Sequence, residues 1–298
     1  MTIREAVSRG SSELKASGIE TYSLDSSLLL ARALNISRSA LIANGTDALS
    51  EEAHSRYRDF IERRKNGECA AYILGSKEFR GLEFTVNESV LVPRPDTETL
   101  VEAALEVLDN NIGLIQKLKF KDNSIYILDL CAGSGAVAVA LKHERQELKV
   151  AATDISAEAL EIAEKNAEKL LGAGKIRFYR GDLFDALPHS TLPDERAYSM
   201  IVSNPPYIPS GEIQYLSPEV RGEPRLALDG GESGLEIIER IIESAPAFLI
   251  SGGTLLLEAD PGQMEKITQL MKLKGFINIK LFKDMAGLNR VIGGSVEK

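Results

Sequence analysis

The sequence predicts an α/β fold, in which a mostly parallel sheet carries helices on both faces and a small helical domain precedes it. From Ile125 onward, short apolar runs alternate with helix-like segments, which is the pattern of strand–helix repeats. Before residue 77, apolar residues recur only at helical spacing. A glycine-rich run follows the first predicted strand of the repeats, where folds of this class bind ligands.

Residues 1–76 are predicted to form a helical bundle, with helices over Ile3–Ser17, Leu24–Leu34 and Ser50–Lys65. The third has clear end signals, because Ser50 suits an N-cap, glutamates follow it, and basic residues precede Gly67. Its arginines could suggest an RNA contact. Acidic residues are interleaved with them, so a solvated or protein-facing surface is favoured.

Residues 77–92 are predicted to form a β-hairpin that links two domains. The segments 78–86 and 89–92 alternate like strands, and 87–88 reads as the turn between them. The run Pro93-Arg94-Pro95-Asp96-Thr97-Glu98 then begins a helix that extends to about Leu108, with Asp96 or Thr97 as its cap.

The remaining residues, 93–298, are predicted to hold the parallel sheet. Seven strands are expected, at Ile125–Leu130, Lys149–Asp154, Ile176–Arg180, Ser199–Ser203, Thr254–Glu258, Phe276–Phe282 and Asn289–Ile292. Four helices are expected between them, at Ala136–His143, Ala157–Leu171, Gly234–Leu249 and Gln263–Lys274.

Composition excludes several classes of protein. The chain is 44% hydrophobic and 27% charged, as a soluble globular protein is, and its net charge of −9 argues against a general electrostatic grip on nucleic acid. Cys69 and Cys131 make no disulfide framework and fit a reducing compartment, and the three histidines show no metal-ligand spacing. No signal-peptide core or membrane-length apolar run is present. We expect a cytoplasmic protein without a metal.

A nucleoside site is predicted at the carboxyl ends of the strands. Within Asp129-Leu130-Cys131-Ala132-Gly133-Ser134-Gly135, the glycines let the backbone turn sharply and approach a ligand. Asp154 ends the second strand, where a carboxylate can accept both hydrogens of a ribose diol. Asp182 and Leu183 follow the third strand and could place a carboxylate and an apolar side chain around an adenine.

The identity of the nucleoside follows from two further features. The run from Gly133 to Ala138 also matches the dinucleotide fingerprint, and a lone match is weak. Asp129 lies where it could meet the amino group of a methionine moiety, and a hydride-transfer enzyme does not need the loop described next. Both favour S-adenosylmethionine over NAD; the remaining alternative is an α/β domain with incidental glycines.

That loop is Asn204-Pro205-Pro206-Tyr207, and it follows the strand Ser199–Ser203. The prolines stop the strand and stiffen the loop. The side-chain oxygen of Asn204 and the carbonyl of Pro205 can each accept one hydrogen of a planar NH2 group, and Tyr207 can stack on its face. The alternative interpretation is an ordinary proline-rich turn.

Together these residues resemble class I S-adenosylmethionine-dependent methyltransferases that act on exocyclic or amide nitrogens. They are most similar to the release factor glutamine methyltransferases (the HemK/PrmC family), over roughly Ala71 to Ile292. The stretches that carry the closer similarity are Pro93–Glu98, Asn204–Ile208, Glu223-Pro224 with Ala227-Leu228, Gly230-Gly231 with Gly234-Leu235, and Asp284 with Gly287 and Arg290-Val291. The loop alone is shared with DNA adenine methyltransferases.

The resemblance implies a Rossmann-like seven-stranded domain that uses S-adenosylmethionine to methylate N5 of the glutamine in the Gly-Gly-Gln motif of peptide chain release factors. Implied cofactor contacts are Asp129, Cys131, Ala132, Gly133, Ser134, Gly135, Asp154, Asp182, Leu183 and Asn204. Implied substrate contacts are Asn204, Pro205, Pro206 and Tyr207, of which Asn204, Pro205 and Tyr207 are also the catalytic candidates. Cys131 and Asp260 stand where the family often has glycine.

The implied mechanism is catalysis by positioning, because a glutamine amide is a poor nucleophile and no strong base is visible near the loop. The resemblance also implies a monomer that recognises the release factor by its shape, through the helical domain and Pro93–Glu98, without nucleic acid. Two alternatives stay open: N-methylation of adenine or cytosine in nucleic acid, which a large basic cleft would favour, and a non-catalytic nucleoside-binding module.

Overall fold

The computed structural model describes residues 1–115, 124–187 and 198–297. The chain divides into two compact units. The first comprises residues 1–77 together with 216–222, and the second comprises residues 78–215 and 223–298. The segment 216–222 thus leaves the second unit, completes the first, and returns.

The first unit is a helical bundle, as the spacing of apolar residues predicts. Its helices are α1 (Ile3–Ala16), α2 (Tyr22–Leu34), α3 (Arg38–Ala43), α4 (Glu51–Lys65), α5 (Ala70–Leu74) and α9 (Pro218–Arg221). Ser50 caps α4 by accepting the amide hydrogen of Ala53. Leu14, Leu29 and Leu30 are fully buried in its core. The short helices α3, α5 and α9 were not predicted, because one or two turns carry too little periodicity.

Two buried polar arrangements define the packing of this unit. Tyr57 of α4 hydrogen-bonds Ser26 of α2 at 2.7 Å, and a Cβ at Gly10 of α1 would lie 1.9 Å from the Tyr57 hydroxyl. Arg64 is 4% exposed and pairs at 2.7 Å with both Asp25 and Glu219. An arginine at this depth is stabilised by such pairing. The ion pair between Arg64 and Glu219 attaches the segment 216–222 to the rest of the bundle.

The hairpin exists, but its predicted strands are wrong. It consists of β1 (Ser76–Phe79) and β2 (Leu82–Thr85), and residues 89–92 are not a strand. The chain reverses at Arg80 and Gly81, whose φ angles are 50° and 75°. Positive φ at both central residues is the requirement of the tight turn that suits a two-residue hairpin, and the glycine favours it. The alternation of apolar residues through 78–86 hid this turn.

The second unit contains the predicted seven-stranded sheet, in the order β5-β4-β3-β6-β7-β9-β8. Its strands are β3 (Tyr126–Leu130), β4 (Lys149–Asp154), β5 (Ile176–Arg180), β6 (Tyr198–Ser203), β7 (Leu249–Glu258), β8 (Phe276–Lys283) and β9 (Asn289–Val296). The first five are parallel, and β9 is antiparallel to both of its neighbours. Strand β7 begins five residues before the prediction, because Gly252 and Gly253 interrupt its apolar run.

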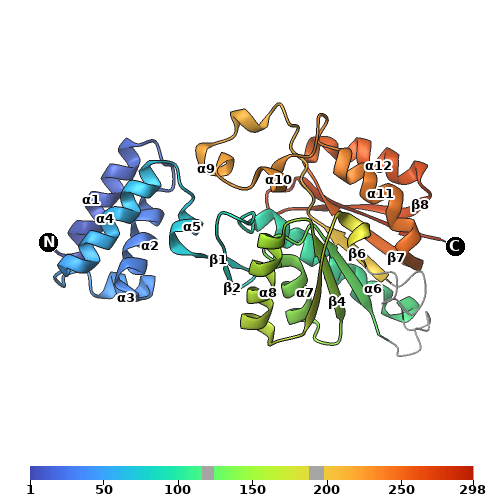
Figure 1. Ribbon diagram of the computed structural model, residues 1–298, viewed down its shortest axis with the longest axis horizontal. Coiled ribbons are helices and arrows are strands. Elements are labelled where there is room, and N and C mark those ends of the chain that lie inside the picture. The colour runs from blue at the N-terminus through green and yellow to red at the C-terminus, as the bar shows by residue number, and fades with distance from the viewer. Residues whose placement is uncertain (116–123, 188–197, 298) are drawn as a thin grey trace. The chain divides into compact units, whose positions relative to one another are not determined.

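Helices cover both faces of the sheet (Figure 1). The helices α6 (Glu98–Ile115), α7 (Ala136–Glu144) and α8 (Ala157–Leu171) bury their apolar residues on one face, and α11 (Glu236–Phe248) and α12 (Met264–Leu273) bury theirs on the other. Short helical turns complete the unit: η1 (Pro95–Thr97), η2 (Leu183–Ala186), η3 (Ile213–Tyr215), α10 (Arg225–Leu228) and η4 (Pro261–Gln263).

The strand order reverses at one point in the sheet, and a ligand is expected to bind there. The chain proceeds from β3 through β4 to β5 on one side, and then returns to add β6 on the other side of β3. Leu130 at the end of β3 pairs with Thr153 of β4 and Ser203 of β6, so the three strands end level with one another. In open α/β sheets, a crevice forms beyond the carboxyl ends at this reversal.

Candidate active site

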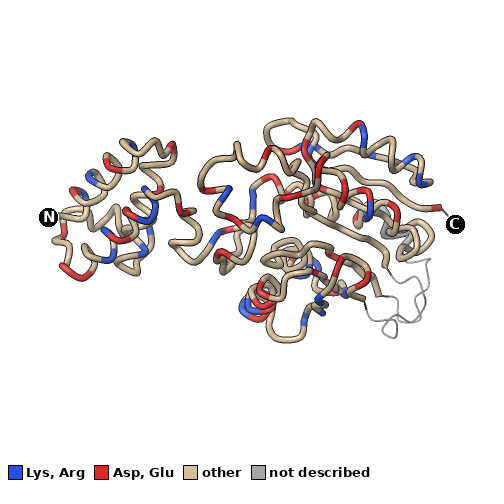
Figure 2. The backbone as a smooth tube through the Cα atoms, turned by 45° about the horizontal axis from the view of Figure 1, so that its top comes forward, with Lys and Arg blue, Asp and Glu red and all other residues tan. Residues whose placement is uncertain are grey.

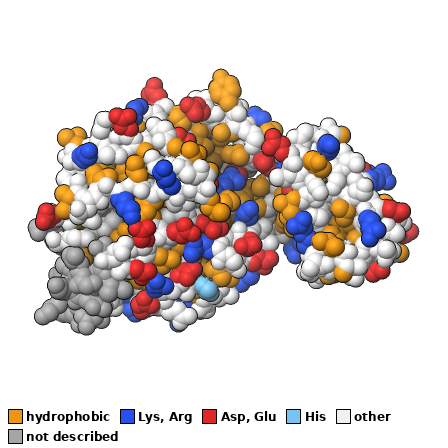
Figure 3. Space-filling model, turned by 180° about the vertical axis from the view of Figure 1, so that it is seen from behind, with side chains coloured by type: hydrophobic (Ala, Val, Ile, Leu, Met, Phe, Trp, Pro, Cys, Tyr) orange, Lys and Arg blue, Asp and Glu red, His pale blue; other side chains and the backbone are white. Residues whose placement is uncertain are grey.

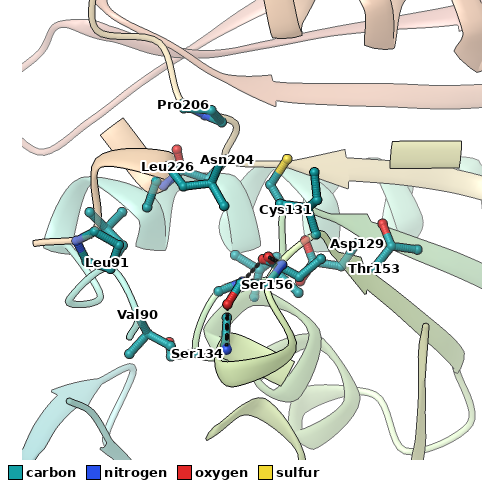
Figure 4. A pocket seen from close by; sticks show the side chains of 18 of the residues that line it. Val90, Leu91, Asp129, Cys131, Ser134, Thr153, Ser156, Asn204, Pro206 and Leu226 are labelled. Carbon is teal, nitrogen blue, oxygen red and sulfur yellow. Dashed lines mark hydrogen bonds between the residues drawn. The ribbon is translucent and has the colours of Figure 1, made fainter. Parts of the chain in front are cut away.

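A cavity of about 240 Å³ lies beyond the carboxyl ends of β3, β4 and β6. In Figure 4, Asn204 and Leu226 lie at one end of it, and Ser134 and Ser156 lie at the other. Ten of the residues predicted from sequence line it: Asp129, Cys131, Ala132, Gly133, Ser134, Asp154, Asp182, Leu183, Asn204 and Pro206. Three others do not: Gly135 is the N-cap residue of α7, Pro205 is buried, and Tyr207 lies outside the lining.

The glycine-rich loop is tied to the end of β4. Gly133 and Gly135 have φ angles of 54° and 79°, which glycine adopts without strain. The amide of Gly133 donates to Oδ2 of Asp154 at 2.8 Å, and the amide of Ser156 donates to Oδ1 at 2.9 Å. Each oxygen keeps a further lone pair, so the carboxylate can still accept two ligand hydroxyls. Burial raises the pKa of Asp154 while these amides lower it.

Asn166 of α8 holds the other side of this loop. It is fully buried, and its side-chain nitrogen donates to the carbonyls of Ser134 at 2.9 Å and Thr85 at 3.0 Å. Its side-chain oxygen accepts the amide of Thr85 at 2.7 Å. The hairpin strand β2 is therefore joined to the cavity wall by one side chain. Sequence reasoning missed Asn166, because it lies within a regular amphipathic helix.

Asp129 is the most strongly perturbed acid of the cavity. It is 1% exposed, and its Oδ2 accepts the amide of Ala138 at 3.0 Å. Burial raises its pKa to about 8, and the charge of Asp154 acts in the same direction. A carboxyl group of this kind favours a cationic ligand group, because a positive charge beside it would restore its ionised form.

Cys131 and Leu183 have positive φ angles, of 60° and 49°, although neither is glycine. This backbone conformation costs an L-residue about 1–2 kcal/mol, a cost that glycine would not carry. Burial raises the pKa of the Cys131 thiol, so it stays protonated. Leu183 is buried next to Asp182, which pairs with Arg240 of α11 at 2.7 Å.

The loop Asn204–Tyr207 is held by close backbone packing. A Cβ at Gly234 would lie 2.4 Å from the Tyr207 carbonyl, and one at Gly230 would lie 2.8 Å from the Pro206 carbonyl. The side-chain nitrogen of Gln263 donates to the Tyr207 carbonyl at 2.9 Å. Burial raises the pKa of Tyr207, so its hydroxyl stays neutral. These contacts restrict movement of the loop backbone.

Asp260, the N-cap residue of η4, supports this arrangement. Its carboxylate accepts the amide of Gly262 at 2.8 Å, and its own amide donates to the side-chain oxygen of Gln263 at 3.2 Å. This reciprocal cap orients Gln263 toward the loop. Asp260 therefore has a local structural role, because it orients Gln263.

Four further residues were not assigned to the site from sequence. Thr97 of η1 accepts the side-chain amide of Asn204 at 3.1 Å, and it also hydrogen-bonds Glu258 at the end of β7. Thr97 is the last residue of η1 and directly precedes α6, and the prediction that Asp96 or Thr97 caps this helix stays a prediction. Glu223 pairs with Arg94 and accepts the amide of Val92 at 3.1 Å. The sequence shows that acidic residues and prolines cluster around these positions. It does not show which of them meet, because the contacting residues are about a hundred or more positions apart.

The charge of the cavity matches a small ligand better than a polyanion. Its charged lining residues are two arginines, Arg94 and Arg240, and three aspartates, Asp129, Asp154 and Asp182. Along the described chain, acidic and basic residues are interspersed (Figure 2). The face seen in Figure 3 shows the same mixture. On the described part of the face that Figure 3 shows, no large patch of basic side chains is visible.

The carboxylate acceptors and the apolar lining of the cavity fit a nucleoside that carries a cationic amino acid. Asp154 suits a ribose diol, Asp129 suits an ammonium group, and Leu183 gives an apolar contact for a base. Among the residues that the structure describes, no cluster of side chains could hold a metal ion. Within the same residues, none of the helices is long and apolar enough to cross a membrane.

Comparisons with known proteins show what the chain is similar to. Residues 5–75 match the family model described as "PrmC N-terminal domain", and residues 107–216 match "Methyltransferase small domain". A release factor glutamine methyltransferase of Coxiella burnetii is 41% identical over 292 residues, which cover 98% of each chain. One from Geobacter sulfurreducens is 36% identical, over 99% of this chain and 97% of that protein. A solved structure of the human METTL16 N-terminal domain with SAH is 17% identical, with a TM-score of 0.50 over 86% of this chain and 87% of that one.

Proposed function

The chain belongs to the family of release factor glutamine methyltransferases, and on this premise we propose that it methylates N5 of a release factor glutamine, using S-adenosylmethionine. The motif Gly-Gly-Gln supplies that glutamine. The observation that carries the proposal is the placement of Asn204 and Pro206 in the wall of a cavity whose carboxylate and apolar side chains fit the cofactor. The same placement favours an enzyme over a non-catalytic nucleoside-binding module.

We propose that two acidic side chains and one apolar side chain hold the cofactor. Asp154 accepts the ribose hydroxyls, Asp129 faces the amino group of the methionine moiety, and Leu183 contacts the adenine. Cys131 to Gly135 contribute a closely approaching backbone, and Asp182 is held nearby by Arg240. When bound, S-adenosylmethionine supplies a methyl group on a positively charged sulfur, which makes that methyl group electrophilic.

The chain's own residues act on the glutamine amide. The side-chain oxygen of Asn204 and the carbonyl of Pro205 accept its two hydrogens, so the nitrogen is aimed into the cavity. These acceptors also stabilise the positive charge that develops on the nitrogen during transfer, and they need little reorganisation because close contacts hold the loop backbone. Tyr207 has a role in positioning, since its hydroxyl is held neutral.

The partner is proposed to be a protein recognised by shape. The mixed charge of the surface and the acidic majority in the cavity support a protein substrate over a nucleic acid. The helical unit and the run Pro93–Glu98 are proposed as its contact surfaces. We further propose that the enzyme is monomeric and cytoplasmic, where translation termination takes place.

Transfer of a labelled methyl group from S-adenosylmethionine tests this function. The substrates are a purified bacterial release factor, the same factor with Gln→Ala in its Gly-Gly-Gln motif, and a duplex DNA. Label on the unaltered factor alone is the expected result. Label on DNA, or equal label on the Gln→Ala factor, would refute the assignment.

A further inference from the structure

We propose that Thr97 and Glu258 are positioning residues, which determine which edge of the Asn204 amide faces the substrate. This inference rests on the proposed function, because it concerns how the same cavity orients a glutamine amide. Its basis is a chain of hydrogen bonds that runs from Glu258 through the hydroxyl of Thr97 to Asn204.

The three residues come from separate elements of the second unit. Thr97 ends η1, Asn204 follows β6, and Glu258 ends β7. Thr97 is 4% exposed and Glu258 is 1% exposed, whereas Asn204 is half-buried and lines the cavity. The chain of bonds therefore begins in the core and ends at the substrate loop.

The number of available protons sets the direction of these bonds. An ionised carboxylate only accepts, so Thr97 must give its single hydroxyl hydrogen to Glu258. The Thr97 oxygen can then only accept from Asn204, which must turn its NH2 group toward Thr97, and the observed distance is 3.1 Å. The opposite edge of the amide, its oxygen, is left to accept a hydrogen from the substrate. In the flipped orientation two oxygens would face each other at Thr97, and two NH2 groups would face each other at the substrate.

A structural explanation accounts poorly for the buried carboxyl group. Oε2 of Glu258 is buried and has no hydrogen-bond partner among the residues that the structure describes. Burying an acid without full compensation is costly, and a glutamine or an apolar residue would cost less if only packing mattered. An obligate acceptor for the Thr97 hydrogen explains why an acid is present.

The protonation of Glu258 gives this arrangement a measurable consequence. Glu258 faces Asp96 and Arg94 from the η1 segment, Arg290 from β9, and Tyr207 from the loop after β6. Burial raises its pKa to about 7, so its protonated form accumulates as the pH falls below 7. A protonated carboxyl group can donate to Thr97, and the direction of the bonds is then no longer determined.

The test compares single-turnover rates of methyl transfer, with release factor and cofactor both saturating. Thr97→Val keeps the shape of the side chain but removes the hydroxyl, and we expect it to slow transfer by about tenfold to a hundredfold. We expect Thr97→Ser to restore most of the rate. Thr99→Val is the matched control, because Thr99 is also a buried threonine, lies two residues further along at the start of α6, and is outside the cavity lining.

Two binding measurements separate positioning from structural damage. The Kd for S-adenosylhomocysteine and the KM for the release factor are expected to stay within about threefold in Thr97→Val, since one neutral hydrogen bond contributes about that much. A loss of cofactor binding parallel to the loss of rate would overturn the inference. So would a wild-type rate in Thr97→Val, or equal loss in Thr97→Ser.

Glu258→Gln tests the direction of the bonds independently. Glutamine, like the protonated acid, can donate to Thr97 as well as accept from it, so the rate at pH 8 is expected to fall toward the rate that the unaltered enzyme shows at low pH. The unaltered enzyme is expected to slow below about pH 7, and Glu258→Gln is expected to lack this decline. An acid decline that persists in Glu258→Gln would overturn the role of Glu258. If the unaltered enzyme labels no release factor at all, the proposed function itself fails, which is a different result.

Discussion

The amide of Gly133 donates to Oδ2 of Asp154 at 2.8 Å, so the loop after β3 and the carboxylate that ends β4 form one structure. The same carboxylate is proposed to hold the ribose of the cofactor. The shape of the loop and the affinity for the cofactor therefore depend on a single side chain.

Asp154→Asn is expected to weaken binding of S-adenosylhomocysteine by about tenfold to a hundredfold. The change removes the charge that strengthens its hydrogen bonds, each of which contributes about 1.5–3 kcal/mol. Isothermal titration calorimetry measures the affinity. Asp185→Asn is the control, because Asp185 is exposed and lies outside the cavity lining. Equal weakening in the control would contradict the assignment.

Binding of the cofactor is expected to depend on pH through Asp129. In the free protein burial raises its pKa to about 8, so at pH 6 the carboxyl group is neutral. A bound ammonium group favours the ionised form and lowers that pKa, so binding releases a proton. The Kd for S-adenosylhomocysteine should therefore fall as the pH rises from 6 to 7.5, by at most about tenfold per pH unit.

Calorimetry in two buffers of different ionisation enthalpy measures the released proton directly. Asp129→Asn is expected to bind more weakly and to release no proton over this range. Proton release that is unchanged in Asp129→Asn would show that another group titrates.

Asn204→Ala is expected to lower the rate of methyl transfer by about a hundredfold or more, which is the usual loss when one preorganised polar group is removed from a transition state. Cofactor affinity should change by less than about threefold, because Asp129 and Asp154 stay in place. Tyr207→Phe should keep much of the activity, since the Tyr207 hydroxyl is not required to transfer a proton. Equal losses of rate and affinity in Asn204→Ala would contradict a role in catalysis.

Gly234→Ala is expected to impair catalysis by displacing the substrate loop. Its φ is 77°, and a Cβ would lie 2.4 Å from the Tyr207 carbonyl and 2.8 Å from the side-chain nitrogen of Gln263. Gly275→Ala is the matched control, because φ there is 82° and nothing lies within 4 Å of a Cβ. Both variants carry about 1–2 kcal/mol of backbone strain, so the difference between their transfer rates and melting temperatures reports the clash. Equal behaviour would argue against close packing at Gly234.

Arg64→Met is expected to destabilise the helical unit by about 3 kcal/mol, because it leaves Asp25 buried without its partner. Glu219→Gln should cost much less, since the Glu219 side chain is 41% exposed and can be hydrated. Urea unfolding of the full chain measures both. If Asp25→Asn in the Arg64→Met background does not recover part of the loss, the uncompensated charge is not its cause.

Regular elements and the sites next to them could be predicted from the chain alone. The strand–helix repeats, the glycines after β3 and the acid at the end of β4 are local patterns, and a parallel sheet necessarily brings the carboxyl ends of its strands together. This is why ten predicted residues line one cavity. The hairpin strands were misplaced, because an unbroken alternation concealed the turn at Arg80 and Gly81.

The supporting residues became apparent only in the tertiary structure. Thr97 and Asn204 are 107 positions apart, and Arg94 and Glu223 are 129 apart. Their meeting depends on how η1, β6 and β7 pack, and no periodicity records a contact between single polar side chains. Local patterns therefore determined the fold, the cofactor half of the site and the substrate loop, because burial repeats along the chain. Packing decided which buried polar groups orient that loop, because hydrogen bonds depend on positions in space.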